Sequence, residues 1–187
     1  MIVGKYYMEL DTHHEPGVLE EEILYIIAET PLHYWDKQLC LTHPKDCEDP
    51  WYHGCGSRMY ATDNGIKFKQ YDREVPLREE DFTELNYKLQ AFPYTFDLIK
   101  GLKEKYQLGR IRIMVSMRKT ALTWHKDTED RIHIPVVTHP GCRMVIEDES
   151  FHMSTGKIWK VSTNGHYHSA FNGSPIDERI HIVGTLL

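Results

Sequence analysis

The sequence predicts an α+β fold. A double-stranded β-helix, the cupin-like jelly roll, is expected in the C-terminal half, with helices from the N-terminal half packed on it. Before Gly109, apolar residues recur at helical spacing, whereas after it they alternate along short segments that turn residues separate. Short strands at a spacing of about 8–12 residues are typical of a sandwich or barrel, and a jelly roll encloses a pocket between two sheets.

The chain has 187 residues, which suits one domain with a substantial core. We expect residues 1–108 to form a mostly helical and loop support region for the substrate, and residues 109–187 to form the catalytic core. A net charge of −6 argues against a general nucleic-acid binder. No apolar run approaches the roughly 20 residues that span a bilayer, and no signal-peptide pattern is visible, so a cytoplasmic location is expected.

The N-terminal half is expected to contain a strand over residues 1–9 and three helices. The first helix starts near Pro16, and its acidic run Glu20–Glu22 suits the helix dipole and forms a solvated face. The second is expected over Pro76–Gln90 and the third over Phe96–Leu108. The apolar residues whose spacing predicts the helices are Leu19, Ile23, Ile26 and Ile27, then Phe82, Leu85 and Leu89, then Phe96, Ile99, Leu102 and Tyr106.

Residues 32–66 combine turn formers with aromatic side chains and predict strands and long loops. Five candidates for a substrate-pocket wall are Trp51, Tyr52, Arg58, Tyr60 and Trp124, although such aromatics equally cap a core. The four cysteines form no CxxC pair, so free thiols are expected. Four zinc-type ligands, His43, Cys47, His53 and Cys55, match no finger spacing, and loop roles are favoured for them.

The C-terminal half is expected to contain six strands with period-two alternation. They are Arg110–Met117, Arg131–Val137, Cys142–Glu147, Lys157–Ser162, Gly165–Asn172 and Glu178–Leu186. Residues two apart on a strand point to one face, so Arg131 shares a face with His133, and Arg179 with His181. In a purely structural β-protein, these faces would be exposed to solvent.

His125 and Asp127 are also two apart, so an extended segment aims an imidazole and a carboxylate at one point. Two histidines and one carboxylate on one side of a metal form the arrangement of non-haem Fe(II) oxygenases, which leaves positions open. A distant strand could supply the second histidine. His166 and His168 share a face there, and spacing alone does not choose between them.

Six segments carry a resemblance to a known family: Trp124-His125-Lys126-Asp127, Arg131-Ile132-His133-Ile134-Pro135, Pro140-Gly141-Cys142, Met153-Ser154-Thr155-Gly156-Lys157-Ile158-Trp159, His168-Ser169-Ala170-Phe171-Asn172 and Arg179-Ile180-His181-Ile182. In this order they resemble the aspartyl/asparaginyl β-hydroxylases, a family of Fe(II)/2-oxoglutarate oxygenases that includes small bacterial members acting on free proline. The resemblance covers about residues 109–187.

The resemblance implies a role for each matching position. His125, Asp127 and His168 fall on the positions that bind the metal, Fe(II). Arg179 falls on the arginine that binds the distal carboxylate of 2-oxoglutarate. Four residues are implied to contact the co-substrate: Arg179 and Ser116 at its distal carboxylate, and Arg131 and His133 near its metal-binding end. Asp127 also argues against a halogenase, in which this position must be free for a halide.

The implied activity is O₂-dependent hydroxylation of a free amino acid or of a peptide side chain, with decarboxylation of 2-oxoglutarate to succinate. Asn164, His166 and Asn172 are candidates for pocket roles or for plain loop roles. Two other classes stay open. A cupin-like metalloenzyme that does not use 2-oxoglutarate would leave Arg179 without a purpose, and a non-catalytic jelly-roll binding module would require all these positions to coincide by chance.

Overall fold

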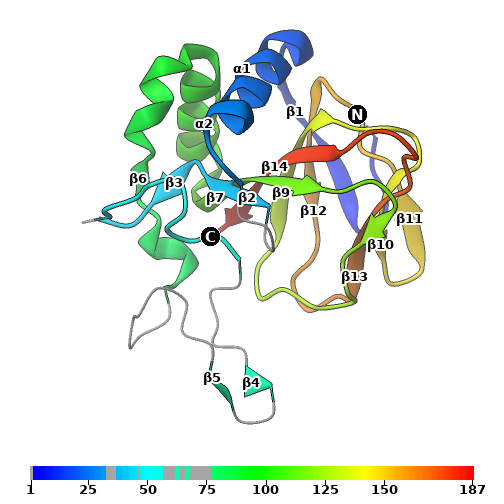
Figure 1. Ribbon diagram of the computed structural model, residues 1–187. Coiled ribbons are helices and arrows are strands. Elements are labelled where there is room, and N and C mark those ends of the chain that lie inside the picture. Colours follow the sequence, from blue (N-terminus) through cyan, green and yellow to red (C-terminus); the bar gives the residue numbers. More distant parts are fainter. Residues whose placement is uncertain (1, 33–36, 46, 57–61, 64–65, 68–76) are drawn as a thin grey trace.

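The computed structural model describes residues 2–32, 37–45, 47–56, 62–63, 66–67 and 77–187. The described chain is mostly β-sheet, with two α-helices, α1 (Pro16–Glu29) and α2 (Pro93–Tyr106) (Figure 1). The larger sheet has six antiparallel strands in the order β1-β12-β9-β14-β7-β2. A second sheet has four antiparallel strands in the order β11-β10-β13-β8.

The strands of these two sheets are β1 (Tyr7–His13), β2 (Gln38–Cys40), β7 (Leu108–Ser116), β8 (Thr120–Ala121), β9 (Arg131–Val137), β10 (Cys142–Ile146), β11 (Glu149–Phe151), β12 (Lys157–Val161), β13 (His168–Asn172) and β14 (Arg179–Leu186). Two short pairs complete the described strands: β3 (Thr42–His43) with β6 (Glu84–Leu85), and β4 (Thr62–Asp63) with β5 (Ile66–Lys67). The six strands expected after Gly109 are all present, which confirms the period-two interpretation.

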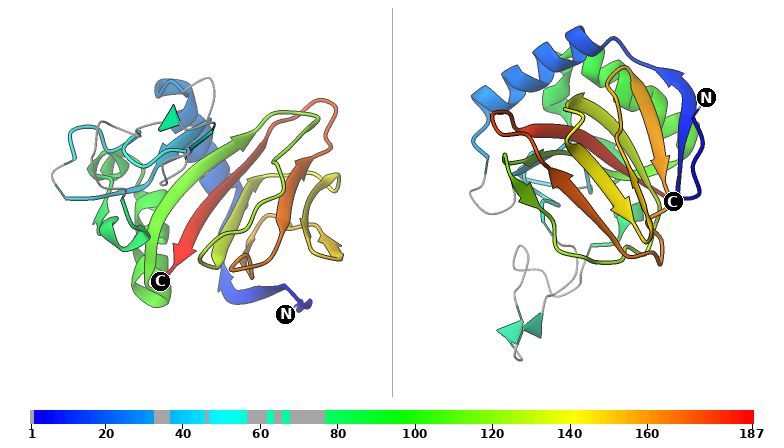
Figure 2. Two further views of the ribbon diagram at one scale, coloured as in Figure 1. Left: turned by 90° about the horizontal axis from the view of Figure 1, so that it is seen from below. Right: turned by 90° about the vertical axis from the view of Figure 1, so that its right-hand side faces the viewer.

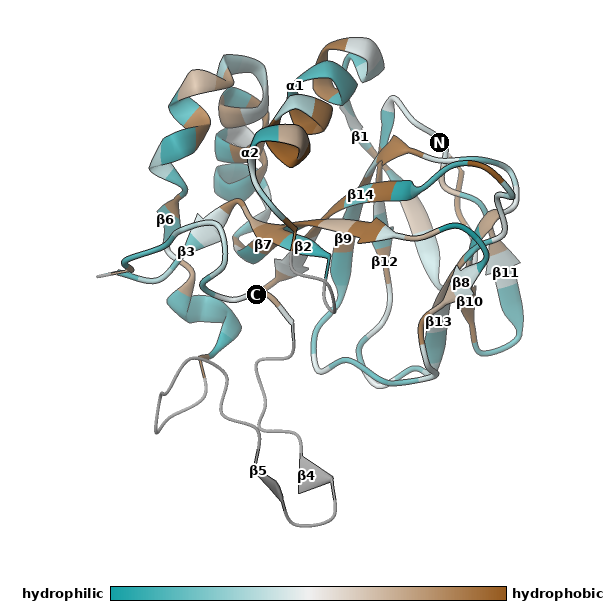
Figure 3. Cartoon of the chain, in the orientation of Figure 1, coloured by the Kyte–Doolittle hydropathy of each residue, from teal (hydrophilic) through white to brown (hydrophobic). Residues whose placement is uncertain are grey.

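The central strands β7, β9 and β14 present two chemically different faces. Apart from Val183, their isoleucines and valines, including Ile113, Ile134 and Ile182, lie in or against one core with residues of α1 and α2. The helices accordingly cover this face of the large sheet (Figures 1 and 2). Figure 3 shows brown, hydrophobic stretches along the same strands. A smaller core that includes Met144 and Trp159 joins the second sheet to the first. Alternation therefore leaves the polar side chains of these strands on the side opposite the helices.

Two of the expected N-terminal elements are wrong or displaced. The first strand begins at Tyr7 and continues to His13, where a turn was expected. The described part of the second expected helix, residues 77–90, instead forms two 3₁₀ turns, Glu79–Asp81 and Tyr87–Ala91, on either side of β6. The buried Asn86 is one reason, because its side-chain amide donates to the Cys40 carbonyl at 2.9 Å and its carbonyl accepts from the Lys88 N–H at 3.0 Å.

Close packing of Glu79 against β7 is a second reason. A Cβ atom at position 109 would lie 2.4 Å from the backbone oxygen of Glu79, so only glycine admits this approach. The end of α2 also differs from expectation, since Gln107, with φ of 51°, provides the left-handed C-terminal residue. Gly109 therefore serves packing within β7 and not helix termination.

The acidic run on α1 has a role that the expectation of a solvated face missed. No acidic residue lies in the first turn of α1. Glu22 instead accepts hydrogen bonds from the backbone N–H groups of Tyr94 at 3.2 Å and Thr95 at 2.7 Å, in the first turn of α2. These N–H groups have no partner within the helix, and a carboxylate there also suits the helix dipole.

We expect Glu22→Ala to lower the free energy of unfolding by about 1 kcal/mol, the usual value of an N-terminal cap. Urea unfolding followed by circular dichroism measures this change. Glu21→Ala is the matched control, because Glu21 is exposed one position earlier on the same helix. Equal midpoints for the two variants would contradict a capping role for Glu22.

Candidate metal centre and its cavity

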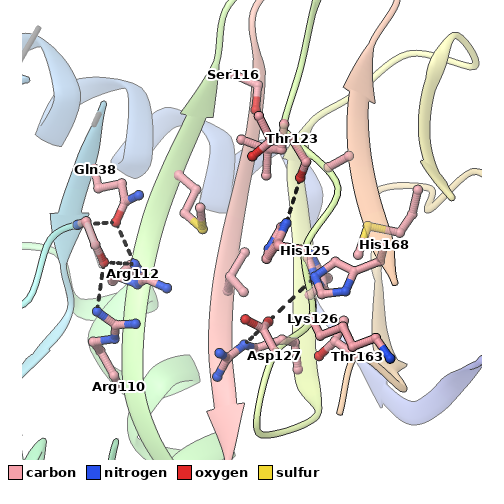
Figure 4. A pocket seen from close by; sticks show the side chains of 18 of the residues that line it. Gln38, Arg110, Arg112, Ser116, Thr123, His125, Lys126, Asp127, Thr163 and His168 are labelled. Atoms are coloured by element: carbon pink, nitrogen blue, oxygen red, sulfur yellow. Dashed lines mark hydrogen bonds and ion pairs between the residues drawn. The ribbon is translucent and has the colours of Figure 1, made fainter. Parts of the chain in front are cut away.

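A cavity of about 410 Å³ lies on the polar side of the large sheet. Its wall is formed by residues of β7, β9, β13 and β14, and by the segment 122–128 that connects β8 to β9. Figure 4 shows the labelled histidines on one side of the red strand β14, and Arg110 and Arg112 on the other. The period-two rule therefore directs the charged side chains of the central strands into an enclosed site and not into solvent.

His125, Asp127 and His168 converge in this cavity. One nitrogen or oxygen atom of each lies within 4.8 Å of the others. The backbones of His125 and His168 exchange two hydrogen bonds, at 3.2 and 2.9 Å, which form an isolated antiparallel bridge between segment 122–128 and the start of β13. Asp127 is held in the same way, because its carbonyl accepts from the Gly165 N–H at 3.0 Å. Backbone pairing thus fixes all three side chains.

Both histidines have one ring nitrogen hydrogen-bonded to a backbone carbonyl. Nδ1 of His125 lies 2.8 Å from the oxygen of Thr123, and Nδ1 of His168 lies 3.0 Å from the oxygen of His166. A carbonyl oxygen only accepts, so each Nδ1 carries the hydrogen and each Nε2 keeps a free lone pair. Burial lowers the pKa of His168, which favours the neutral form that a metal requires.

The choice between His166 and His168 is made by the geometry. The His166 ring packs beside Tyr6, with ring centroids 5.0 Å apart, and its Nδ1 lies 3.7 Å from a carboxylate oxygen of Glu147. Its contribution to the site is the backbone carbonyl that orients His168. His168 alone of the two joins the cluster, as the resemblance implied.

Asp127 is held as a carboxylate by a neighbouring arginine. Nε of Arg131 donates to Oδ2 of Asp127 at 2.9 Å, and Nε2 of His168 lies 3.7 Å from the same oxygen. Burial by itself would raise the pKa of Asp127, but Arg131 and the two histidines together hold that pKa below its ordinary value. Arg131 therefore contacts the proposed metal ligand directly, beside the role that the resemblance implies for it.

No sequence pattern points to Glu79, the residue that organises this charge network. It is 1% exposed and binds Arg110 through two hydrogen bonds, at 3.2 and 3.1 Å. The same carboxylate lies 3.5 Å from Nη1 of Arg131, which also donates to the hydroxyl of Thr185. In the sequence, Glu79 belongs to an acidic run that resembles a solvated helix turn.

Arg179 lies at the other end of the cavity, where β14 begins. It pairs in register with Ser116 of β7, and both line the cavity. Arg179 is 4% exposed, and within the described chain its one hydrogen bond is from Nη2 to Nδ1 of His181, at 2.9 Å. Burial lowers the pKa of Arg179 to about 10, so the side chain stays cationic at neutral pH. It is a buried positive charge without an acidic partner among the described residues.

Two further candidates support this arrangement in different ways. His133 is buried on the cavity wall, and its Nδ1 has no hydrogen-bond partner within the described chain. Asn172 lies outside the wall and donates to the carbonyls of Ser116 and Asp177, both at 3.0 Å. It therefore ties the end of β7 to the turn before Arg179. Asn164 takes part through a backbone bridge to Asp127.

The other candidates do not reach the cavity. Trp51 is buried in the core beneath the helices, Tyr52 packs against that core, and Trp124 is 52% exposed. None of the three lines the cavity, while Arg58 and Tyr60 lie outside the described residues. Within the described chain, His43, Cys47, His53 and Cys55 do not gather into a metal-binding group, and His43 lies in β3.

Comparison with known proteins decides the family. The sequence profile of the Aspartyl/Asparaginyl beta-hydroxylase family matches residues 59–184. The chain belongs to this family. The family expected from the sequence is thereby confirmed. The match covers the whole cavity-lining part of the large sheet from β7 onward, including His125, Asp127, His168 and Arg179.

Searches with the whole chain give more distant similarities. No curated protein matches it. The structure is similar to an oxidoreductase of the 2OG-Fe(II) oxygenase family from Burkholderia pseudomallei, with 15% identity and a TM-score of 0.42 over 50% of this chain and 55% of that one. It is also similar to a Pseudomonas putida prolyl-4-hydroxylase, with 9% identity and a TM-score of 0.49 over 97% and 92% of the two chains. Within the described residues of the hydroxylase-family chain, neither α-helix is long and apolar enough to cross a membrane.

We expect Glu79→Gln to lower the free energy of unfolding by about 3 kcal/mol or more, because it removes the carboxylate that binds the buried Arg110 and also lies near Arg131. Urea unfolding measures this loss. Glu80→Gln is the matched control, since its side chain is 53% exposed and pairs only with the exposed Arg78. A loss of similar size in both variants would remove Glu79 from the centre of the network.

Proposed function

We propose that this chain is an Fe(II)/2-oxoglutarate-dependent dioxygenase. It hydroxylates a C–H bond of a free amino acid or of an amino-acid side chain in a peptide, and it converts 2-oxoglutarate and O₂ to succinate and CO₂. The observation that carries the proposal is the placement of a His-Asp-His cluster and an unpaired buried arginine in one cavity. We also propose that the two sheets are the two halves of a double-stranded β-helix.

The three side chains suit iron by their chemistry. Two neutral imidazoles and one carboxylate form the facial set of non-haem Fe(II) oxygenases, in which the remaining positions are open to the co-substrate and oxygen. Both Nε2 atoms have free lone pairs, and Asp127 is held ionised by Arg131. When bound, Fe(II) supplies the redox chemistry that activates O₂ for attack on a C–H bond.

Arg179 is the proposed anchor for the distal carboxylate of 2-oxoglutarate. A guanidinium presents a planar fork that matches two carboxylate oxygens, and burial strengthens the resulting charge-assisted bonds. The carboxylate would give this buried cation the acidic partner that the described chain does not provide. Ser116, opposite Arg179 in the register, offers a hydroxyl to the same group.

His133 and Arg131 are proposed to serve the metal-binding end of the co-substrate. The free Nδ1 of His133 can donate to an oxygen of the proximal carboxylate, which would satisfy a buried polar atom. Arg131 holds Asp127 in place and contributes positive charge near that end. The chain's contribution is thus to orient the reactants and to balance charge.

A cupin-like metalloenzyme that does not use 2-oxoglutarate is the alternative. It accounts for the cluster of His125, Asp127 and His168 equally well. It leaves the buried charge of Arg179 without a partner, however, and a buried unpaired charge is costly. The position of Arg179 in the cavity therefore favours the 2-oxoglutarate enzyme.

We expect the metal-free protein, titrated with Fe(II) and then 2-oxoglutarate under anaerobic conditions, to develop a visible charge-transfer band. The band arises when 2-oxoglutarate chelates iron through its 2-oxo group and its proximal carboxylate. His125→Ala, Asp127→Ala and His168→Ala should each weaken iron binding and remove the band while the circular dichroism spectrum stays unchanged. Iron binding without a band in the wild-type protein would favour the alternative enzyme, and no specific iron binding would contradict both.

We expect Arg179→Gln to weaken 2-oxoglutarate binding about 30-fold or more, because it removes one partner of a buried charge pair. Titration of the same band gives the affinity. Arg118→Gln is the control, since Arg118 is exposed beyond the end of β7. Unchanged affinity in Arg179→Gln would discredit Arg179 as the anchor.

A further inference from the structure

A second arginine of the cavity also forms no ion pair with an acidic side chain among the described residues. Arg112 of β7 is 7% exposed and lines the cavity on the side away from His125 (Figure 4). Its hydrogen bonds come from Nη1 alone, which donates to the side-chain oxygen of Gln38 at 2.7 Å and to the carbonyl of Gly56 at 3.1 Å. Nε of Arg112 is buried without a partner. The free edge of the guanidinium, Nε with Nη2, is the one that binds two carboxylate oxygens side by side.

The other arginines of the cavity are neutralised. Arg110, two residues earlier on the same face of β7, is bound by both carboxylate oxygens of Glu79. Arg131 is paired with Asp127. Arg179 receives the distal carboxylate of 2-oxoglutarate under the proposed function. Glu79 also acts on Arg112 through its charge, but Arg112 remains the cavity arginine that, within the described chain, has no direct contact with a carboxylate and no assigned ligand. Retaining such a charge is costly for stability, which is typical of a group kept for binding.

Arg112 is also too far from Arg179 to serve the same carboxylate. In the register of the large sheet, Arg179 pairs with Ser116, and Arg112 pairs with Val183. Four residues along a strand correspond to about 13 Å. The two guanidinium groups thus belong to opposite ends of the cavity. Figure 4 shows His125, Asp127 and His168 across the red strand β14 from Arg112. A co-substrate anchored at Arg179 and directed toward that cluster leaves Arg112 free.

We propose that Arg112, held in place by Gln38, binds a carboxylate group of the substrate and so selects acidic substrates or free amino acids by their acid group. This inference rests on the proposed function. It names the substrate class as a carboxylate-bearing amino acid or side chain, which enters at the Gln38 and Gly56 end of the cavity. Arg110 and Gln38 are positioning residues in this arrangement, since Arg110 shares the Gly56 carbonyl with Arg112.

A stability comparison separates a binding role from a structural one. Arg112→Met removes an unpaired buried charge, so the urea midpoint should stay unchanged or rise. Arg110→Met breaks a bidentate buried pair and should lower the midpoint clearly. If Arg112→Met lowers the midpoint as much as Arg110→Met, Arg112 is part of the structural network and the proposal is wrong.

The binding test uses the anaerobic protein loaded with Fe(II) and 2-oxoglutarate, to which the twenty L-amino acids and their α-amides are added one by one. The readout is the change in the charge-transfer band. We expect at least one amino acid to perturb the band. Its α-amide should leave the band unchanged, or, where the side-chain carboxylate is the group bound, Asn or Gln should do so in place of Asp or Glu. In Arg112→Gln, the affinity for that acid should fall roughly 10- to 100-fold, the range for a lost hydrogen bond to a charged group, while 2-oxoglutarate affinity stays unchanged. Arg118→Gln should behave as wild type.

Other outcomes overturn the inference. Three results would each exclude a carboxylate subsite at Arg112. They are an equal effect of acids and amides on the band, no effect of any acid, and an unchanged affinity for the acid in Arg112→Gln. A loss of 2-oxoglutarate affinity in Arg112→Gln would assign Arg112 to the co-substrate instead. Absence of the band in the wild-type protein is a different failure, because it contradicts the proposed function before any amino acid is added.

Discussion

The buried carboxylate of Glu79 is the interaction on which the arrangement of the cavity depends. It holds Arg110 through two hydrogen bonds and lies within ion-pair distance of Arg131, which in turn holds Asp127. The position and ionisation of the proposed metal ligand are thus linked to a residue on a short 3₁₀ turn outside the two sheets. Packing makes this link possible, since Gly109 lets the backbone of Glu79 approach β7.

Because side chains alternate along three strands of the large sheet, its two faces have different roles. One face of β7, β9 and β14 is apolar and binds the helices, and the other carries the charged groups of the cavity. Register then sets the spacing along the cavity, because Arg179 pairs with Ser116 at one end and Arg131 pairs with Thr185 at the other. Under the proposed function, the co-substrate occupies the first end and the substrate reaches the middle from the side of Arg112.

The parts of this arrangement that local spacing determines were predictable from the sequence. Strands with period-two alternation are specified by neighbouring residues, so β7, β9 and β14 and the shared face of Arg131 and His133 followed directly. The convergence of His125 and Asp127 followed from the same rule. The choice of His168 over His166 needed the family resemblance.

The parts that depend on distant partners were not predictable. Residues 77–91 carry a helical pattern, but Asn86 and Glu79 find partners on β2 and β7 that outweigh local preference. Glu22 looked like a solvated acid because its partners, the first N–H groups of α2, lie about seventy positions later. Nothing in the sequence around Arg112 distinguishes it from Arg110, although Glu79 neutralises only Arg110 by hydrogen bonds.

A crystal structure of the anaerobic complex with Fe(II) and 2-oxoglutarate, with anomalous diffraction at the iron edge, tests the central claim most directly. The account predicts one iron peak within coordination distance of His125, Asp127 and His168, and the distal carboxylate of 2-oxoglutarate on Arg179. Iron at another location would contradict the metal centre. Iron at this centre with the distal carboxylate on Arg112 would contradict the assignment of the two arginines.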